Sequence, residues 1–385
     1  MPKRKILTFS GWYLPGYRGG GPIRTLANMV DRLGDEFEFK IVASDRDSKD
    51  TKSYPGIIVD GWNNVGKAKV FYISPKRRSL RDIRRILRST EYDVLYLNSF
   101  FSPFTIKPLL IRWLGLVSDK PLVIAPRGEF SPGSLSLKRL KKRVYIAVVK
   151  KVNFYRGVVW QASSEYDETN IRRWFGKDAK VIIAPDLPLL IHSLGESEMR
   201  CNKVRGILNI LFLSRISPEK NLYSALEMLI GLKGQIQFNI YGPIGNEVYW
   251  AQCQKIISRL PEYIKVRYCG SVANEKVVPI MEKHDLFFLP TKGENFGHVI
   301  LEAFCAGCPV LISDQTQWRD LEKKNIGWDL PLDSQDMFRN VLQRCVDMDN
   351  TEYMKWSDGA RRYGLQVIKD ERTVEKNRRL FKEIN

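Results

Sequence analysis

The chain has 385 residues, of which 44% are hydrophobic, and this composition is sufficient for the buried cores of two domains. Its 62 Lys and Arg residues outnumber its 43 Asp and Glu residues and give a formal net charge of +19, so an anionic partner surface is expected. The six cysteines lack the dense spacing of a disulfide scaffold. Without a signal-peptide pattern or an apolar stretch of ~20 residues, we expect a cytoplasmic protein.

Short apolar runs alternate with helix-length segments along the whole chain. In the first half, the predicted strands span residues 5–11, 39–45, 69–74, 93–99, 121–128, 157–164 and 180–185. In the second half, they span residues 209–215, 236–242, 264–270, 285–290 and 309–314. This alternation predicts an α/β protein with parallel sheets. A polar break at residues 192–205 separates the two series, so we place the domains at 1–195 and 196–370.

Three consecutive glycines follow the first predicted strand. Gly19, Gly20 and Gly21 permit backbone conformations and close contacts that a Cβ atom would hinder, and Pro22 suits the first turn of a helix. The contiguous glycines do not have the G-x-G-x-x-G spacing of a dinucleotide-binding loop. The segment is either a plain turn or a phosphate-binding loop, with Arg24 as a weaker candidate for phosphate contact.

Much of the positive charge lies in one part of the first half. Residues 67–156 hold 21 Lys and Arg residues and 5 Asp and Glu residues, a net charge of +16. Two segments in this part, 79–89 and 136–152, have helical periodicity and interleave basic with apolar residues. Each is either a core-facing helix with a solvated basic back or an interfacial helix that binds anionic lipid. Aromatic-rich RNA-binding signatures do not occur, which argues against a nucleic-acid partner.

Two short patterns have the spacing of metal sites. Asp45 and Asp47 have a D-x-D spacing that can bind Mn²⁺ or Mg²⁺, but they lie in a charged run without a supporting pattern, so a surface loop is favoured. Cys305 and Cys308 have C-x-x-C spacing, but neither a second pair nor spaced histidines accompany them, so packing is favoured. We therefore expect no metal site.

A pair of cations marks the first predicted strand of the second half. Arg215 ends the strand at 209–215, and Lys220 follows five positions later. Ligands of open parallel sheets bind at the carboxyl ends of the strands. There the Arg guanidinium can bind phosphate as a fork and the Lys ammonium can bind it as a point charge, so the pair can neutralise a diphosphate leaving group.

Two carboxylates flank a helix start in the second half. Glu294 follows the predicted strand at 285–290, and residues 295–297 turn into a helix that begins near His298. Glu302 then lies about one turn inside the helix, by the ~3.6-residue period. Free N–H groups and the positive end of the helix dipole point to the same space, which suits phosphate. The two carboxylates can hold hydroxyl groups at the loop and deeper in a groove, so the site suits a sugar attached to a nucleoside diphosphate.

Together these motifs resemble those of the group 1 glycosyltransferases, which are retaining enzymes of the GT-B type. The resemblance rests on the R-x4-K element at 215–220, the E-N-F-G-x4-E element at 294–302 and the E-A-x-x-x-G-x-P-V element at 302–310. It implies an α/β fold of two Rossmann-like domains with parallel sheets and a cleft between them. It further implies that the first domain binds the acceptor, that the second binds the donor, and that a C-terminal helix at 371–385 crosses back to the first domain.

The resemblance also assigns roles to residues of the donor site. Arg215 and Lys220 would hold the donor diphosphate, Glu294 and its loop the transferred sugar, and Glu302 the ribose. The glycine loop would close over the donor phosphate from the other domain. The donor-binding residues expected in this way are Gly20, Gly21, Arg215, Lys220, Asn295, Phe296, Gly297, His298 and Glu302.

A departure from the family pattern occurs at residues 126–128, Pro-Arg-Gly. Many family members carry His-Gly here, so this chain resembles a subgroup in which Arg127 takes the place of the histidine. We expect Arg127 and Glu294 to act in catalysis, with Asn98 and Ser99 at the acceptor site. Because Arg cannot serve as a base, the expected mechanism is a front-side substitution in which the leaving phosphate takes the acceptor's proton.

The expected function is transfer of a hexose-type sugar from a nucleoside-diphosphate sugar to a saccharide acceptor in cell-surface polysaccharide or lipopolysaccharide synthesis. We expect a lipid-linked acceptor, no cofactor and no metal. We also expect a peripheral location on the inner face of the plasma membrane, where 79–89 and 136–152 would bind the anionic surface. The alternatives are another GT-B enzyme, such as a sugar-phosphate synthase or a nucleotide-sugar epimerase, and a non-catalytic basic module that binds membranes.

Overall fold

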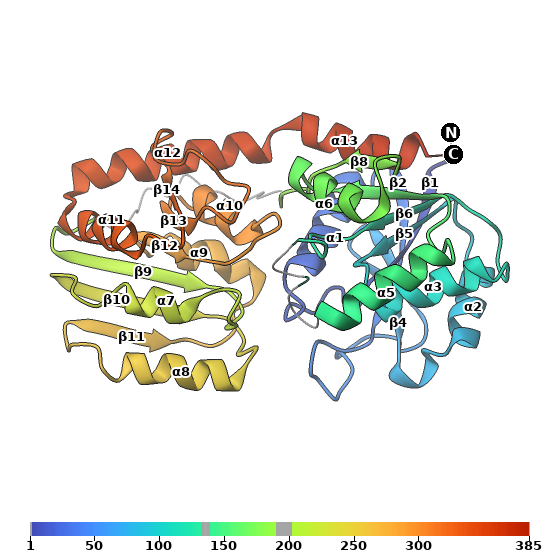
Figure 1. Cartoon of the computed structure of the whole chain (residues 1–385), viewed down its shortest axis with the longest axis horizontal. Helices are drawn as coiled ribbons and strands as arrows, with labels where there is room; N and C mark the ends of the chain where they lie inside the picture. The colour runs from blue at the N-terminus through green and yellow to red at the C-terminus, as the bar shows by residue number, and fades with distance from the viewer. Residues whose placement is uncertain (1, 132–134, 136–138, 190–201, 385) are drawn as a thin grey trace. The chain divides into compact units, whose positions relative to one another are not determined.

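The protein is divided into two compact units in a computed structural model that describes residues 2–131, 135, 139–189 and 202–384. Unit 1 comprises Met1–Leu190 together with Asp370–Asn385, and unit 2 comprises Ile191–Lys369. The domain boundary expected after residue 195 lies outside the described residues. Strands are flanked by helices in both units (Figure 1).

Unit 1 is built on an eight-stranded sheet with the strand order β3-β4-β2-β1-β5-β6-β7-β8. Its strands are β1 (Arg4–Phe9), β2 (Phe37–Ser44), β3 (Trp62–Val65), β4 (Ala68–Ile73), β5 (Val94–Asn98), β6 (Leu122–Ala125), β7 (Val158–Ala162) and β8 (Val181–Ile183). Its helices are α1 (Gly21–Leu33), η1 (Pro75–Arg77), α2 (Leu80–Ser89), α3 (Pro103–Trp113), α5 (Arg139–Lys151), α6 (Glu165–Phe175) and α13 (Glu371–Lys382).

Apolar side chains cover both faces of this sheet, as expected for parallel strands with helices on either side. Along β1, Leu7 and Phe9 belong to one buried cluster, whereas Ile6 belongs to the other. All pairs are parallel except β3 with β4, which form an antiparallel pair at the sheet edge. The sheet of unit 1 is therefore not entirely parallel, which corrects the prediction at its edge.

The C-terminal helix α13 packs within unit 1. Its Phe381 ring makes edge contacts with Phe37, Phe39 and Tyr96, with ring centroids 5.3–6.0 Å apart. Arg378 forms an ion pair with Glu36 at 2.7 Å. Apolar contacts therefore join the last helix to β2 and β5, and an ion pair joins it to the turn before β2.

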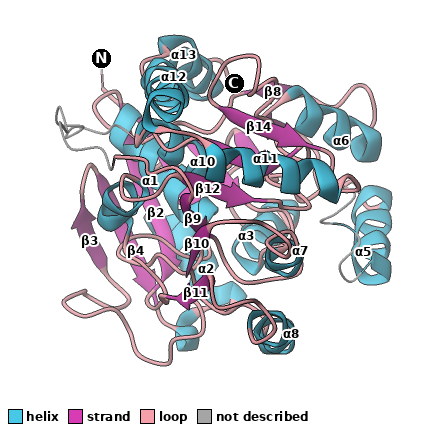
Figure 2. Ribbon diagram, turned by 90° about the vertical axis from the view of Figure 1, so that its left-hand side faces the viewer, coloured by secondary structure: helices cyan, strands magenta, loops and turns pink. Residues whose placement is uncertain are grey.

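Unit 2 is built on a six-stranded parallel sheet with the order β11-β10-β9-β12-β13-β14. Its strands are β9 (Ile207–Leu213), β10 (Gln235–Tyr241), β11 (Ile264–Tyr268), β12 (Leu286–Leu289), β13 (Val310–Ser313) and β14 (Gly327–Leu330). Its helices are α7 (Leu222–Glu227), α8 (Glu247–Ile257), η2 (Asn274–Lys276), α9 (Val277–Met281), α10 (His298–Cys305), α11 (Gln335–Asp347) and α12 (Asn350–Ile368). Figure 2 shows the strands of the molecule in magenta among the cyan helices. Two parallel-sheet, Rossmann-like units confirm the predicted α/β fold class.

Candidate active site at the strand ends of the two units

Each sheet has a topological switch point, where the connections that leave two neighbouring strands run in opposite directions across the sheet. In unit 1 this point lies between β1 and β5, and in unit 2 it lies between β9 and β12. A crevice outside the carboxyl ends of such strands is the usual ligand site of an open α/β sheet. The glycine loop follows β1, Ser99 follows β5, Arg215 follows β9, and Glu294 follows β12. The expected site residues thus gather at the switch point of each sheet.

Arg215 is exposed directly after β9 and is approached by the loop that follows β10. A Cβ atom at Gly245 would lie 2.8 Å from Arg215 Cγ, and a Cβ atom at Gly242 would lie 2.0 Å from the carbonyl oxygen of Ser214. The φ angle of Gly242 is +135°, which also favours glycine. Gly242 and Gly245 were not singled out from the sequence, although two glycines three positions apart after a strand are a recognisable signal.

Lys220 and Glu294 are brought together from two loops of unit 2. Lys220 Nζ lies 2.5 Å from Glu294 Oε2, and the side chains are 13% and 20% exposed. Lys220 Nζ also donates to the carbonyl oxygen of Gly293 at 3.3 Å. The backbone N–H of Lys292 donates to the carbonyl oxygen of Glu219 at 2.7 Å, which joins the two loops. A cation and a carboxylate are therefore held side by side and remain partly accessible.

The turn before α10 is held by aromatic packing. The carbonyl oxygen of Phe296 accepts hydrogen bonds from Trp318 Nε1 at 2.8 Å and from Gln317 Nε2 at 3.2 Å. The Phe296 ring is buried and packs on His298, with centroids 4.7 Å apart, and on Trp318. Phe296 therefore anchors the loop with its side chain. Asn295 is half-buried.

Gly297 and the first turn of α10 suit an anion. Gly297 has a φ angle of +75° and precedes α10 without a side-chain cap, and the first turn holds no acidic residue. Backbone N–H groups at such a helix start can bind phosphate. Glu302 lies one turn further along and is 8% exposed. Of the predicted donor residues in unit 2, Glu302 is thus the more buried carboxylate and Glu294 the more accessible one.

The cysteines after Glu302 are in the core. Burial, followed by the negative charge of Glu302, raises the pKa of Cys305 to about 12. Burial also raises the pKa of Cys308 well above its usual value. Metal binding and thiol exchange require thiolates, so both side chains act as packing groups. Among the residues that the structure describes, no group of three or more His, Cys, Asp or Glu side chains is arranged to hold a metal ion.

The glycine loop of unit 1 also ends in an open helix start. Gly20 has a φ angle of +72° and precedes α1 without a side-chain cap, and α1 has no acidic residue in its first turn. A Cβ atom at Gly20 or Gly21 would meet no atom within 4 Å. Their backbone is therefore accessible, as a phosphate-binding loop requires.

Asp47 holds this glycine loop. Its Oδ2 atom accepts hydrogen bonds from the backbone N–H groups of Tyr17 at 2.8 Å and Arg18 at 3.0 Å. Asp45 is buried and pairs with Arg46 at 2.8 Å. Both carboxylates of the D-x-D pattern are engaged with protein donors, which supports a structural role.

Arg127 lies in a buried polar network at the end of β6. Its guanidinium forms an ion pair with Asp186 and donates to the Tyr96 hydroxyl and, at 3.1 Å, to Asn98 Oδ1. The Arg127 and Asp186 side chains are 8% and 3% exposed. Burial is the largest single influence on the pKa of Arg127 and lowers it, but the charge of Asp186, the smaller contributions of Tyr96 and Asp167 and the hydrogen bond to Asp186 together outweigh it, so the net shift is upward. The structure unites Asn98 with Arg127, and it adds Asp186 and Tyr96, which were not predicted from the sequence.

Ser99 belongs to a second network at the same edge. It has a φ angle of +73°, and its Oγ atom donates to Glu129 Oε1 at 2.6 Å. Glu129 also accepts from the backbone N–H groups of Phe100 and Phe101. Burial raises the pKa of Glu129 despite these hydrogen bonds. Backbone strain at Ser99 and, with a φ angle of +54°, at Arg127 is typical of functional sites.

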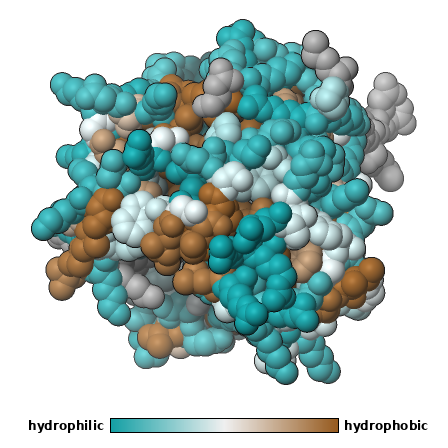
Figure 3. Space-filling model, turned by 90° about the vertical axis from the view of Figure 1, so that its right-hand side faces the viewer, coloured by the Kyte–Doolittle hydropathy of each residue, from teal (hydrophilic) through white to brown (hydrophobic). Residues whose placement is uncertain are grey.

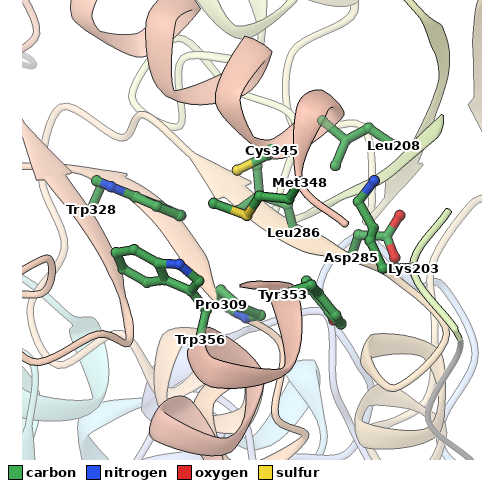
Figure 4. Close-up of a pocket in the computed structure, with 10 residues that line it drawn as sticks. All are labelled: Lys203, Leu208, Asp285, Leu286, Pro309, Trp328, Cys345, Met348, Tyr353 and Trp356. Carbon is green, nitrogen blue, oxygen red and sulfur yellow. The ribbon is translucent and has the colours of Figure 1, made fainter. Parts of the chain in front are cut away.

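A separate small pocket in unit 2 differs from the candidate site in being lined mostly by apolar side chains. The side chains in Figure 4 surround it, and they include Trp328, Trp356, Met348 and Cys345. Lys203 lines it too, but its Nζ atom donates to the carbonyl oxygen of Val204 at 3.0 Å. The pocket contains none of the predicted site residues.

Comparison with known proteins associates the unit 2 site with a family. Residues 204–363, which include Arg215, Lys220, Glu294 and Glu302, match the family model described as "Glycosyl transferases group 1". An "Uncharacterized 41.2 kDa protein in cps region" of Klebsiella pneumoniae is 24% identical over 237 residues, 60% of this chain and 63% of that protein. The phosphatidyl-myo-inositol mannosyltransferase of Mycobacterium leprae (strain TN) is 24% identical over 244 residues, 62% of this chain and 59% of that protein. The alignments thus span less than two thirds of these relatives.

Solved structures share the whole fold. HepE of Anabaena, in complex with UDP and glucose, superposes with a TM-score of 0.72 and 19% identity over 99% of both chains. WaaG, a glycosyltransferase involved in lipopolysaccharide biosynthesis, superposes with a TM-score of 0.69 and 15% identity over 99% of both chains. The Pro-Arg-Gly subgroup stays a prediction. The match over residues 204–363 and the fold shared with GT-B structures support the group 1 glycosyltransferase family for this chain.

Proposed function

We propose that this protein is a retaining hexosyltransferase that moves a sugar from a nucleoside-diphosphate sugar to a hydroxyl group of a saccharide. The observation that carries this proposal is the 2.5 Å ion pair of Lys220 and Glu294, next to the start of α10 and inside the family-matched segment. A cation for phosphate and a carboxylate for sugar hydroxyls are the two chemistries needed on either side of the bond that breaks.

In this proposal, the donor is held mainly by unit 2. Arg215 and Lys220 bind the diphosphate, Glu294 binds hydroxyl groups of the transferred sugar, and Glu302 binds the ribose. The N–H groups at the start of α10 bind phosphate oxygens, and those at Gly20 and Gly21 do the same from unit 1. The UDP and glucose bound to HepE support a nucleoside diphosphate as the donor's leaving group.

The proposed reaction is a substitution on one face of the sugar. The bond between the anomeric carbon and the diphosphate oxygen breaks, and the acceptor oxygen bonds to the same face of that carbon. The acceptor's proton passes to the leaving phosphate oxygen, so no side chain has to act as a base. Arg215 and Lys220 stabilise the negative charge that develops on the diphosphate, which is the role a metal ion has in other enzymes.

Arg127 has a positioning role in this scheme. Arg is effectively always protonated and is bound to Asp186 here, so it cannot take the acceptor's proton. Its contact with Asn98 instead orders the ends of β5 and β6, where we place the acceptor hydroxyl near Ser99.

The proposed acceptor is a lipid-linked saccharide of polysaccharide or lipopolysaccharide synthesis at the cytoplasmic face of the plasma membrane. The cps region, the phosphatidyl-myo-inositol substrate and the lipopolysaccharide pathway named for the similar proteins support this choice. The net charge of +16 in residues 67–156 supports an anionic membrane as partner. No helix in the described part of the chain is long and apolar enough to span a bilayer.

The test is release of nucleoside diphosphate from a panel of nucleotide sugars, with and without saccharide and lipid-linked saccharide acceptors. We expect release that depends on the acceptor and a glycoside product whose anomeric configuration, read by NMR, equals that of the donor. A sugar-phosphate product would indicate a synthase, and acceptor-independent epimerisation of the sugar would indicate an epimerase. An inverted product would contradict the same-face substitution.

A further inference from the structure

Helix α5 has apolar side chains on two sides, and only one side packs into unit 1. Ile146 and Val149 are buried in the core. A second row, spaced four residues apart, faces solvent, with Leu140 77%, Val144 55%, Val148 54% and Val152 43% exposed. Residues four apart lie above one another on a helix. The exposed row therefore runs along α5 and just past its end for about 18 Å, at 1.5 Å per residue.

The end of α3 extends this row. Trp113 Nε1 donates to the carbonyl oxygen of Val152 at 3.2 Å, which holds the two segments side by side. Trp113, Leu114 and Leu116 are 47%, 50% and 38% exposed. We call these three side chains and the row of Leu140, Val144, Val148 and Val152 the apolar face. Figure 3 shows apolar surface lying open beside hydrophilic surface on a side of the molecule.

Basic residues border the apolar face. The described residues of α5 include Lys141, Lys142, Arg143, Lys150 and Lys151, and the helix contains no acidic residue. Lys142 lies over the Phe101 ring at 5.0 Å, and the other four are exposed. Arg112 is paired with Asp119, so this acidic residue is already neutralised. The face is therefore apolar along its centre and cationic along its sides.

The second basic segment joins this face. Arg84 Nε of α2 donates to the carbonyl oxygen of Leu116 at 3.3 Å. Ile83, Ile86 and Leu87 of α2 are buried, so α2 is a core-facing helix with a basic back, whereas α5 has an apolar side to spare. The segments at 79–89 and 139–152 are thus parts of one surface, connected by the end of α3.

We infer that the apolar face inserts into the interfacial layer of an anionic lipid bilayer, with the flanking lysines and arginines at the phosphate level. This inference rests on the proposed function, because it specifies the membrane contact that a lipid-linked acceptor requires. Nucleic acid would match the charge but would leave Leu140, Val144 and Val148 in contact with phosphates. A second copy of the chain would bring two cationic rims together. A bilayer provides both an apolar layer and negative headgroups.

Membrane binding through the apolar face should respond to salt differently from a purely electrostatic attachment. Screening shortens the electrostatic range from ~10 Å at 0.1 M to ~3 Å at 1 M salt, but it does not remove apolar burial. We expect the full-length protein to co-sediment with phosphatidylcholine vesicles that contain phosphatidylglycerol. Salt weakens this binding and leaves a residual part that depends on the apolar face. Vesicles of phosphatidylcholine alone bind less protein.

The deciding variants separate the two contributions. Val144→Ser with Val148→Ser should remove the salt-resistant part of binding, whereas Val248→Ser with Ile230→Ser, exposed apolar residues of unit 2, should not. Lys150→Glu with Lys151→Glu should weaken binding at low salt at least ~25-fold, at about fivefold per neutralised charge. Lys255→Glu with Lys265→Glu, exposed residues of unit 2, serve as the charge control. Trp113→Phe should reduce the quenching of tryptophan fluorescence by brominated lipid chains.

Equal vesicle binding by the Val144→Ser/Val148→Ser variant and the wild type at high salt would overturn the inference. So would unchanged quenching in Trp113→Phe, or light scattering that shows a dimer lost in the same valine variant without any vesicle binding. The vesicle measurements need no donor and no acceptor. A protein that transfers sugar to a soluble acceptor but ignores vesicles would therefore refute only the membrane face. Vesicle binding without any diphosphate release would refute only the proposed function.

Discussion

Lys220 and Glu294 form an ion pair of 2.5 Å between the loop after β9 and the loop after β12, the two strands that flank the switch point of unit 2. A bound diphosphate would compete with Glu294 for the Lys220 ammonium. Glu294 would then be released to accept hydrogen bonds from sugar hydroxyls. In the proposed function, the pair would therefore link occupation of the phosphate site to the state of the sugar site.

The first prediction concerns the two cations. Lys220→Ala and Arg215→Ala should each lower kcat by about 10²-fold or more, because each removes charge stabilisation of the leaving group. Steady-state kinetics at saturating donor checks this, with Lys265→Ala, an exposed residue of the same unit, as the matched control. If both variants have rates near that of the wild type, the assignment of Arg215 and Lys220 to the catalytic site is wrong.

The second prediction concerns metal dependence. Activity should persist in excess EDTA, because Asp45 is paired with Arg46, Asp47 is bonded to backbone N–H groups, and Arg215 and Lys220 supply positive charge instead. The assay is diphosphate release before and after chelation. A loss that Mn²⁺ or Mg²⁺ restores would contradict it.

A third prediction concerns Asp47, whose carboxylate accepts hydrogen bonds from the glycine loop and should therefore affect donor binding. Asp47→Ala removes the acceptor of both backbone hydrogen bonds of the loop, so it should raise the KM for the donor about tenfold, which corresponds to ~1.4 kcal/mol, and change kcat less. Asp47→Asn retains an acceptor oxygen and should recover part of the loss. Asp178→Ala, an exposed residue of unit 1, is the control. A KM equal to that of the wild type in Asp47→Ala would exclude this positioning role.

Hydrophobic periodicity predicted twelve strands, and each corresponds to a strand of the structure, whereas β3 and β14 were missed. β3 (Trp62–Val65) is short, exposed and at the sheet edge, so it has no apolar run. β14 begins with Gly327, where a Cβ atom would lie 2.2 Å from the carbonyl oxygen of Val310. This glycine allows close strand pairing, although glycine alone suggests a break.

The candidate site was predictable where its residues follow the carboxyl ends of neighbouring strands. Lys220 and Glu294 could be assigned to one site because both follow strands whose carboxyl ends meet. The partner of Arg127, Asp186, could not be found in the same way, since it follows β8, which is not a neighbour of β6 in the sheet, and local patterns carry no information on such pairs. The sequence also left the role of α5 undecided, because hydrophobic periodicity shows that a helix has an apolar side but not what covers that side.

Arg127 and Asp186 should contribute strongly to the stability of unit 1. Arg127→Met leaves the Asp186 carboxylate, which is 3% exposed, without its cation, and should cost about 3–5 kcal/mol. Asp186→Asn should also destabilise, and the double variant should lose less than the sum of the single losses, because the two groups interact directly. Chemical unfolding monitored in unit 1 measures this. Additive losses would show that the ion pair has no coupling energy.

The attachment of α13 to unit 1 should weaken in acid. Hydrogen bonds from Arg378, opposed by partial burial, lower the pKa of Glu36 below its ordinary value of 4.5. A carboxyl group with a lowered pKa in the folded state stabilises that state above its unfolded pKa, and this contribution is lost as the pH falls through the folded pKa. The Arg378 and Glu36 side chains are 24% and 35% exposed, so solvent screening limits the contribution to about 1 kcal/mol.

The measurement for α13 is hydrogen exchange and thermal unfolding of the wild type and of Glu36→Gln. Near neutral pH the variant should unfold at a lower temperature and exchange the amides of α13 faster, because Gln cannot pair with the Arg378 charge. The two proteins should converge as the pH falls below the lowered folded-state pKa of Glu36, since Glu36 is then protonated in both states of the wild type. Glu275→Gln, an exposed residue of unit 2, controls for the loss of one negative charge. A difference that stays constant from neutral pH to strong acid would mean that packing of Phe381, and not the ion pair, sets how firmly α13 is held.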